Sequence, residues 1–404
     1  MLSSLFIVLV ALAGILLRPF GLREAWPAMA GAVALVVCGL LPLPDALRAA
    51  GQGWDVYLFL AGMMLLAELA ALEGVFDWAA CLVARAARGS SLRLFCYVYV
   101  LAVFITAFLS NDATAVVFTP AVAAMARAAG VDAKMPYLLI CAFVANAASF
   151  VLPIANPANL VVYGAAMPDL WQWLRLFALP SAAAILGTFL LLWASQAGAL
   201  RQPLAVPVRQ NLPTSGRLTL AGLGAMAALL LVASALGWHL GPPTFAAGAL
   251  TSALVLLRAK KSPWPVLRGV SWSVLPLVAG LFVMLGALDR LGLAEALSRE
   301  VVGFNPFQLG AALAVLCNLV NNLPAGLLAG HVLAGAASHT KAAALIAVDL
   351  GPNLSISGSL ATILWLTALR RHGEHISAWG FLRLGLVIMP PALALALYAL
   401  RFAV

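Results

Sequence analysis

The sequence predicts an all-α polytopic membrane protein with about ten transmembrane helices and two re-entrant helical hairpins, arranged as two inverted repeats. Composition, the length of the apolar runs and the agreement between the two halves of the chain predict this fold class. Hydrophobic residues make up 64% of the 404 residues and charged residues only 9%, against about 25% charged in globular domains. Many apolar runs approach the ~20 residues that a helix needs to cross the bilayer core. They lack the alternation of a barrel strand, so helices are expected.

Ten apolar runs are expected to span the membrane as helices, and two longer runs carry polar residues near the middle. The ten expected spans are 3–17, 25–43, 55–72, 136–162, 173–194, 218–236, 244–257, 271–289, 341–369 and 378–401. The first of them lacks the basic start of a signal peptide, so it is expected to be retained. The interrupted runs, 92–128 and 306–337, are expected to be re-entrant hairpins.

Basic residues predict the orientation. With both hairpins returning to the side they entered, 17 of the 23 Lys and Arg residues fall on one set of loops and 6 on the other. The positive-inside rule makes the first set cytoplasmic and places both termini in the periplasm of a bacterial inner membrane. This count also explains the net charge of +9 without nucleic acid. It does not separate a re-entrant hairpin from two short crossings, because both return to the same side.

The two halves of the chain predict a duplicated unit. The longest polar stretch, "SQAGALRQPLAVPVRQNLPTSGR" at 195–217, lies at the midpoint and is expected to be a cytoplasmic linker between repeats at 1–194 and 218–404. "SNDATAVV" corresponds to "VNNLPAGL" at an offset of 210, and "ANAASFVLPIANPANLVV" to "VDLGPNLSISGSLATILW" at 203. Because one half starts outside and the other inside, the layout is that of inverted-repeat secondary transporters.

One span in each half has residues that break a helix. Pro153 and Pro157 interrupt 136–162, and a Gly351–Pro352 pair interrupts 341–369. Unwound backbone at membrane depth is tolerated only where it is buried in protein or lines a watery cavity. Broken helices at corresponding places of two halves point to a transport site, so the two broken helices are expected to form that site.

Asp112 lies in the middle of the first interrupted run, after Ser110 and Asn111. On insertion scales an aspartate at a helix centre costs about 2.5–3.5 kcal/mol. At a hairpin tip that faces a cavity this cost falls, so Asp112 is expected to have a function. A lone polar residue in a membrane helix more often serves packing, but four polar clusters in two matching pairs favour a site.

At these clusters the chain resembles the arsenical pump membrane protein family, within the ion transporter superfamily. The resemblance rests on "FLSNDATAVVFTPAV", "VANAASFVLPIANPANLVVYG", "NLVNNLPAGLLAG" and "VDLGPNLSISGSLATILWL". It covers essentially the whole chain and is densest at 104–162 and 314–393. It implies efflux of arsenite and antimonite in exchange for protons, a scaffold that carries a transport domain, a homodimer, and a soluble arsenite-stimulated ATPase as a partner. One residue departs from the family pattern: Asn146, in "VANAAS", replaces an acidic residue, whereas its counterpart Asp349 keeps the acid.

Arsenite near neutral pH is mostly an uncharged trihydroxide, so its site needs hydrogen-bonding groups without a fixed cation. The candidate substrate-binding residues at the breaks are Asn111, Asn156, Asn159, Asn321, Asn322, Asn353, Ser355 and Ser357. No Lys or Arg lies near these breaks in the sequence, which disfavours a carboxylate, sulfate or phosphate substrate. A helix N-terminus alone can nevertheless hold an anion.

Proton exchange requires a group that titrates within the membrane. Three carboxylates lie deep in apolar runs, Glu68, Asp112 and Asp349, and burial disfavours the charged form of a carboxyl group. Asp112 and Asp349 are favoured because they sit at the breaks, whereas Glu68 fits a structural role equally well. Arsenic(III) binds thiols, but a thiolate cage at Cys141 and Cys317 would hold it too tightly for rapid release. A membrane cysteine is usually an apolar filler.

Two rival functions stay open. A sodium- or proton-coupled carrier of another small solute or ion would use the same breaks, and a passive channel would depend on a partner ATPase. The sequence holds no HExxH, CxxC, P-loop or GxSxG motif, so no enzyme activity, cofactor or metal site is predicted. The five cysteines fall mostly inside apolar runs, which argues against a disulfide framework.

Overall fold

The protein is helical throughout the residues that its computed structural model describes, which are 2–18, 22–301 and 303–403. The first half contains α1 (Leu2–Leu17), α2 (Ala25–Val37), α3 (Leu43–Gln52), α4 (Trp54–Leu72), α5 (Val75–Ala86), α6 (Ser91–Phe108), α7 (Thr119–Ala128), α8 (Met135–Ala147), α9 (Pro157–Tyr163) and α10 (Leu170–Gln196). The second half contains α11 (Thr214–Ala235), α12 (Gly241–Ala259), α13 (Trp264–Gly269), α14 (Val274–Asp289), α15 (Leu293–Val301), α16 (Pro306–Val320), α17 (Asn322–Val332), α18 (Ser338–Leu350), α19 (Leu360–Arg371) and α20 (Ala378–Ala399).

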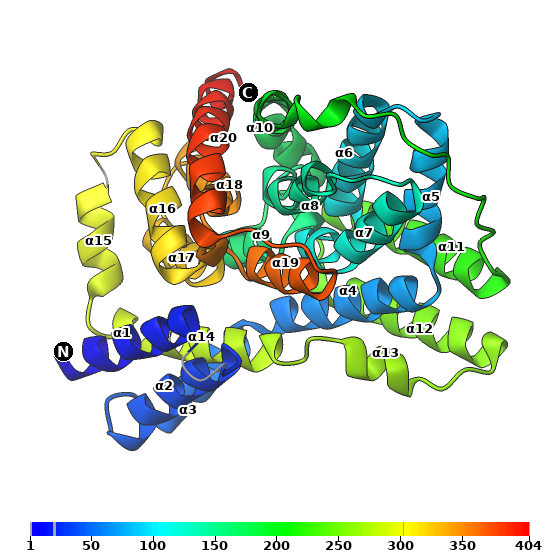
Figure 1. Ribbon diagram of the computed structural model, residues 1–404. Helices are drawn as coiled ribbons and strands as arrows, with labels where there is room; N and C mark the ends of the chain where they lie inside the picture. The colour runs from blue at the N-terminus through cyan, green and yellow to red at the C-terminus, as the bar shows by residue number, and fades with distance from the viewer. Residues whose placement is uncertain (1, 19–21, 302, 404) are drawn as a thin grey trace.

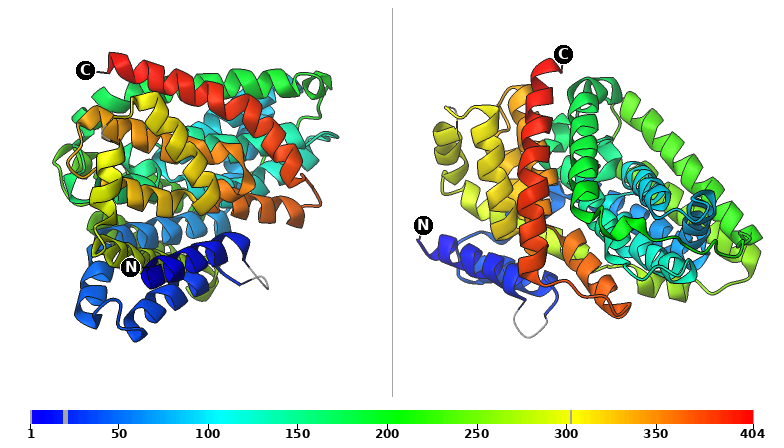
Figure 2. Two further views of the ribbon diagram at one scale, coloured as in Figure 1. Left: turned by 90° about the vertical axis from the view of Figure 1, so that its left-hand side faces the viewer. Right: turned by 45° about the horizontal axis from the view of Figure 1, so that its top comes forward.

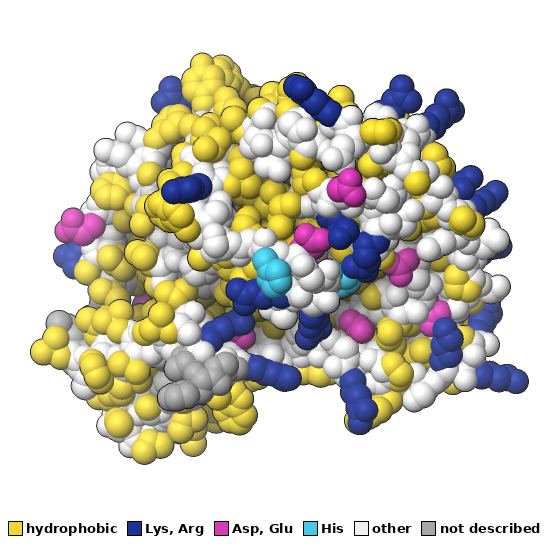
Figure 3. Space-filling model, viewed as in Figure 1, with side chains coloured by type: hydrophobic (Ala, Val, Ile, Leu, Met, Phe, Trp, Pro, Cys, Tyr) yellow, Lys and Arg dark blue, Asp and Glu magenta, His cyan; other side chains and the backbone are white. Residues whose placement is uncertain are grey.

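Helix length and composition agree with a multi-pass membrane protein. Within the described ranges, five helices are long and apolar enough to cross a bilayer, or six if the bent pair α14–α15 counts as one span. Five further apolar helices have 10 to 17 residues, so they are shorter than a full crossing. Large hydrophobic side chains are exposed over wide areas of the surface, as Figure 3 shows. This is expected where the surroundings are lipid rather than water.

The helices form two layers. In Figure 1, α1 to α4 and α11 to α14 lie in the lower part of the molecule, and α6, α8, α10, α16, α18 and α20 lie above them. Figure 2 shows the same division from the side, with α1 and α2 at the bottom and α10 and α20 at the top. The breaks predicted from the sequence lie where these layers meet.

Helix packing in the first half recurs in the second. The pairs α1–α2 and α6–α8 correspond to α11–α12 and α16–α18, and all four pairs are packed together. Between the halves, α4 packs on α12 as α14 packs on α2, and α10 packs on α20. The α4–α12 and α14–α2 contacts are thus equivalent to each other, and α10 and α20 occupy equivalent places in the two halves.

Glycines allow α4 and α12 to pack in close contact. A Cβ at Gly62 would overlap the Thr244 carbonyl, and a Cβ at Gly248 would overlap the backbone of Gly62. Near the start of the pair, the Gly241 amide donates to Asp55 Oδ1 over 2.8 Å. Because contacts early in α4 meet residues early in α12, the two helices run parallel. Small residues at such interfaces let membrane helices approach closely.

The sequence correctly predicted where the helices break. Between α6 and α7 the chain leaves helical form at residues 109–110, becomes helical again at Asn111 and continues as a π-helical turn, Ala113–Phe118. Between α16 and α17, Asn321 adopts a positive φ of 77°, which non-glycine residues seldom do. Short 3₁₀ turns separate α8 from α9 at Pro153–Ala155 and α18 from α19 at Gly351–Gly358.

The sequence prediction missed four helices, α3, α5, α13 and α15. They are short and carry charged residues, for example Asp45 and Arg48 in α3, so they are not apolar runs.

Two expected segments have different bounds in the structure. The expected span 25–43 is shorter, because α2 stops at Val37 and α3 follows. The expected linker 195–217 is shorter, since α10 continues to Gln196 and α11 begins at Thr214. Its backbone is tied to α5–α7 by the Leu204 amide donating to Gly89 O and the Ala205 amide donating to Ala129 O, both over 2.9 Å.

An ion pair fastens the far ends of α4 and α12. Lys261 Nζ lies 2.8 Å from both Glu73 oxygens, and the Glu73 side chain is only 2% exposed. We expect Lys261→Met to lower the free energy of unfolding by about 1–2 kcal/mol, because it leaves a buried carboxylate without its cation. The neighbouring Lys260→Met is the control, since Lys260 has no recorded ion pair among the described residues. Equal thermal midpoints for the two variants in detergent would contradict this role.

Candidate functional site

The break after α6 is held open by its own polar side chains. Asn111 Oδ1 accepts from the Asp112 amide over 2.9 Å, and Ser110 Oγ accepts from the Ala113 amide over 3.1 Å. These bonds satisfy amides that a continuous helix would pair with carbonyls. Thr106 and Thr114, on either side of the break, are hydrogen-bonded at 2.8 Å. The Asp112 side chain is left to face a cavity.

Four predicted residues meet around one narrow cavity. Asn111, Asp112, Asn156 and Asn322 line it, together with apolar residues of α4, α14, α17 and α19. Its volume is about 20 Å³, room for one water-sized group. Both predicted hairpins and the first broken helix therefore contribute a polar side chain to a single enclosed point.

A second cavity adjoins the first through Asp112. Its volume is about 60 Å³, and Ser110, Asp112, Glu68 and Ser271 line it with apolar neighbours. Glu68 of α4 lies directly against Gly269, where any Cβ would overlap its carboxylate. Glu68 and Asp112 thus face the same cavity from the lower and upper layers.

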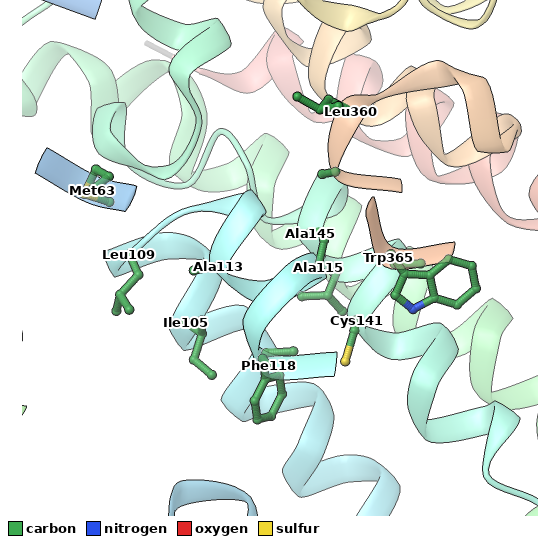
Figure 4. Close-up of a cluster of buried hydrophobic side chains, with 14 of the residues drawn as sticks. Met63, Ile105, Leu109, Ala113, Ala115, Phe118, Cys141, Ala145, Leu360 and Trp365 are labelled. Atoms are coloured by element: carbon green, nitrogen blue, oxygen red, sulfur yellow. The ribbon is translucent and has the colours of Figure 1, made fainter. Parts of the chain in front are cut away.

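Behind the first break, the wall of the site is apolar. Figure 4 shows Ile105 of α6, Phe118 of the π-helical turn and Trp365 of α19 among the buried side chains there. Trp365 is fully buried, and its Nε1 donates to Leu138 O over 2.9 Å. This dry packing fixes the broken segments, because a close-packed interior resists displacement.

Asp349 is fully buried in the last turn of α18. Asn156 Nδ2 donates to its Oδ1 over 2.8 Å, while the Asn156 Oδ1 accepts from the Ala158 amide over 3.0 Å as the N-cap of α9. Asp349 Oδ2 has no hydrogen-bond partner in the described part of the chain. Asn156 therefore links Asp349 to the small cavity that Asn156 itself lines.

Asn159 and Asn321 support the backbone of the breaks. The amide of Asn159 donates to the carbonyls of Ser149, Leu152 and Pro153 at 2.9 to 3.2 Å. Asn321 caps α17 by accepting from the Leu323 amide over 3.4 Å. Neither residue lines the cavity around Asp112. Their amides satisfy groups that the unwound chain would otherwise leave unpaired.

Asn353 and Asn146 join the two broken helices to each other. Asn146 Nδ2 donates to Asn353 Oδ1 over 2.9 Å and to Thr362 Oγ1 over 3.3 Å. Asn353 Nδ2 in turn donates to Phe143 O over 2.9 Å. Asn146 is therefore part of a fully buried amide network.

Ser355 and Ser357 line a separate cleft, and both are hydrogen-bonded to Asn318. Ser355 Oγ donates to Asn318 Oδ1 over 2.6 Å, and Asn318 Nδ2 donates to Gly351 O over 2.9 Å. The cleft has a volume of about 460 Å³, and its lining includes Arg18 and Arg370.

The expectation that no cation lies near the breaks is therefore wrong. Residues distant in sequence are brought together here, because α1 and the end of α19 close the sides of this cleft.

The structure thus does not gather all the predicted residues at one point. Some line the cavities at Asp112, some hold the broken helices together, and Ser355 and Ser357 line a separate cleft.

The sequence analysis did not identify Asn318 and Thr362. The spacing of Asn318 three residues before Asn321, one helical turn, was a usable signal for it. Nothing in the sequence marked Thr362 as a site residue, because a lone threonine in an apolar run is common on helix surfaces. Within the described ranges, no three His, Cys, Asp or Glu side chains come together as a metal site. The thiols of Cys141 and Cys317 point to carbonyls of Tyr137 and Val348.

Comparison with known proteins gives the family. Residues 7–357 match the family model CitMHS, described as citrate transporter. The arsenical pump membrane protein of Yersinia enterocolitica is 28% identical, with 100% of this chain and 99% of that protein covered. One from Escherichia coli is 26% identical over 98% of this chain and 97% of the other. The resemblance found in the motifs is thereby confirmed.

A solved structure shows the same fold. The YdaH transporter of Alcanivorax borkumensis, whose crystal structure is described as having an unusual topology, matches with a TM-score of 0.57. The match covers 88% of this chain and 86% of the other at 14% identity. Because the family model covers most of the sequence, the protein is a multi-pass membrane transporter that belongs to the citrate transporter family.

Proposed function

We propose that this transporter expels arsenite and antimonite across the bacterial inner membrane in exchange for protons, by alternating access. The observation that carries the proposal is the cavity where Asp112 meets the side-chain amides of Asn111, Asn156 and Asn322. Its donors, acceptors and one titratable group match the hydrogen-bonding needs of an uncharged trihydroxide and a proton, while its volume of about 20 Å³ requires the cavity to widen before the trihydroxide can enter. The full-length similarity to arsenical pump membrane proteins supports the substrate.

The proposed fold behind this function is a pair of inverted repeats, 1–194 and 218–404, joined by a cytoplasmic linker, with both termini periplasmic. The interrupted runs 92–128 and 306–337 act as hairpins that carry Asp112 and Asn322 to the membrane midplane. The recurrence of helix pairs between the halves supports this arrangement. Homodimer formation and a soluble ATPase partner belong to the same proposal, on the strength of the family resemblance.

The second candidate is a carrier of a small anion on the same fold. The observation that favours it is the cleft of about 460 Å³ in which Arg18 and Arg370 accompany Ser355 and Ser357. Arg18 is ion-paired with Glu24, so Arg370 is the guanidinium of the cleft that has no recorded ion pair among the described residues. A guanidinium near two hydroxyls suits a carboxylate, and the matching family model is described as citrate transporter.

Everted membrane vesicles distinguish the two candidates. Arsenite and citrate accumulation are measured under an imposed pH gradient, with and without sodium. Gradient-driven arsenite accumulation that is independent of sodium and insensitive to citrate is the expected result. Citrate accumulation without arsenite movement, from protein that is inserted and folded, would replace the first candidate with the second.

The variant Arg370→Gln also distinguishes the arsenite carrier from the anion carrier. Arg370 is exposed at the cleft and has no recorded ion pair among the described residues. We expect this variant to accumulate arsenite within about twofold of the wild type, because an uncharged substrate gains little from a guanidinium. The adjacent Arg371→Gln, which is absent from the cleft lining, is the control. A roughly tenfold loss of citrate accumulation in Arg370→Gln, with arsenite accumulation absent in the wild type, would favour the anion carrier.

A further inference from the structure

Asn146 and Asp349 occupy equivalent places in the two halves. Each is the twelfth residue of a 13-residue helix, α8 for Asn146 and α18 for Asp349. Ten residues after each comes the N-cap of the following half-helix, Asn156 for α9 and Ser359 for α19. Both Asn146 and Asp349 are fully buried.

Each of the two residues also points to the other half of the chain. Asp349 accepts from Asn156, the N-cap of α9. Asn146 donates to Thr362 in the first turn of α19, and the Thr362 hydroxyl is 2.8 Å from the N-cap hydroxyl of Ser359. The two contacts correspond in placement, because each joins the end of one broken helix to the start of the other half's second helix, although the shorter hydrogen bond of Asn146, 2.9 Å, goes to Asn353.

Both side chains keep one oxygen without a partner. Asp349 Oδ2 and Asn146 Oδ1 are buried and accept no hydrogen bond from any described residue. A buried polar atom without a partner is uncommon in a folded protein. The neutral Asn146 thus has a buried oxygen without a described partner, as the carboxyl group of Asp349 does.

Other ionisable groups do not account for this arrangement. The titratable side chain recorded beside Asp349 is Cys317 of α16, whose Sγ donates to Val348 O over 3.8 Å. Around Asn146, the recorded partners from α19 and the preceding turn are the neutral Thr362 and Asn353. Neither position has an ion-pair partner within the described ranges.

We propose that positions 146 and 349 form one proton-coupling element with two equivalent ends. In this chain only the second end, Asp349, carries a carboxyl group. Asn146 is then the neutral end, and it limits the pair to one exchanged proton. The carboxyl group is transferable: at position 146 its oxygens face the Thr362 hydroxyl and the start of α19, as those at 349 face Asn156 and the start of α9. This inference rests on the proposed proton coupling.

The test moves the carboxyl group from one end to the other. Three variants are compared with the wild type: Asp349→Asn, Asn146→Asp, and the double variant Asn146→Asp/Asp349→Asn. The control double variant, Asn322→Asp/Asp349→Asn, restores the same charge at the position equivalent to Asp112. Protein in detergent is followed by infrared difference spectroscopy between two pH values, which detects protonation of a carboxyl group without any substrate.

The carboxyl signal of position 349 is expected to disappear in Asp349→Asn and to return in the exchanged double variant. In vesicles, the exchanged variant should recover pH-driven arsenite accumulation to within about threefold of the wild type, and the control double variant should not. An exchanged variant that is folded, with an unchanged thermal midpoint, but lacks both signal and transport overturns the proposal. If that variant does not fold, Asn146→Asp alone must add a carboxyl signal, and its absence also overturns the proposal. Wild-type protein that moves no arsenite while the infrared signal still moves between positions would refute the substrate and leave this inference standing.

Discussion

Asp112→Asn is expected to reduce pH-driven arsenite accumulation in everted vesicles by about tenfold or more, while the protein still inserts and folds. Coupling free energies between two ligands are about 1–3 kcal/mol, which corresponds to about 5–150-fold in affinity. Asp112 is the one carboxylate that lines both of the adjoining cavities at the first break. Asparagine keeps the shape and the acceptor oxygen of Asp112 but cannot exchange a proton. The variant therefore separates arsenite binding from proton coupling.

Two comparisons make this prediction specific. Arsenite binding to purified Asp112→Asn should persist, because the neighbouring amides of Asn111, Asn156 and Asn322 remain. Glu68→Gln is the matched variant, since Glu68 lines only the larger cavity. If Glu68→Gln loses gradient-driven transport and Asp112→Asn keeps it, the proton is carried from the α4 side and the role given to Asp112 is wrong. Loss in both variants would show that the shared cavity acts as one coupling site.

Gly62→Ala is expected to destabilise the protein by about 2 kcal/mol or more, because overpacking an already dense contact forces backbone shifts. The added Cβ would overlap the carbonyl group of Thr244 and the amide nitrogen of Phe245, both backbone atoms of α12. A flexible side chain could move away, but a packed helix backbone cannot do so without separating α4 from α12. The contact joins the two halves of the chain, so the whole lower layer is affected.

The matched control for this prediction is Gly224→Ala in α11. No atom lies within 4 Å of the Cβ that this change adds, and alanine is a better helix former than glycine by about 1 kcal/mol. Thermal midpoints in detergent should therefore fall for Gly62→Ala and stay level or rise for Gly224→Ala. A midpoint for Gly62→Ala equal to that of the control would show that α4 and α12 are less tightly packed than the structure indicates.

The sequence predicted the helical class and the breaks because both depend on local chemistry. Lipid leaves no water for the backbone, so long apolar runs become helices. Proline and glycine at 153, 157, 351 and 352 interrupt helices, as their local chemistry favours, although Pro180 and Pro390 are accommodated inside α10 and α20. The short helices α3, α5, α13 and α15 were missed because they carry charges, and charged residues in a membrane protein first suggest loops.

The candidate site was only partly predictable. The sequence identified most of the polar residues at the breaks but not Asn318 or Thr362, and the motif offsets paired Asp112 with Asn322 and Asn146 with Asp349. Asn159 gives no different signal from Asn156, yet one satisfies carbonyls and the other lines the cavity. The direction of a side chain in unwound backbone depends on local dihedral angles, which no periodicity reports.

By itself the sequence determined that this chain is a helical membrane protein and predicted two matching halves, because hydrophobicity, charge and helix-breaking residues act locally or through simple counts. Only the tertiary structure decided which polar groups share a cavity and that Arg18 and Arg370 lie beside Ser355 and Ser357. It also decided that Asp349 meets Asn156 and that Asn146 meets Thr362. These contacts join residues that are between 193 and 216 positions apart, and the packing of one half against the other alone brings them together.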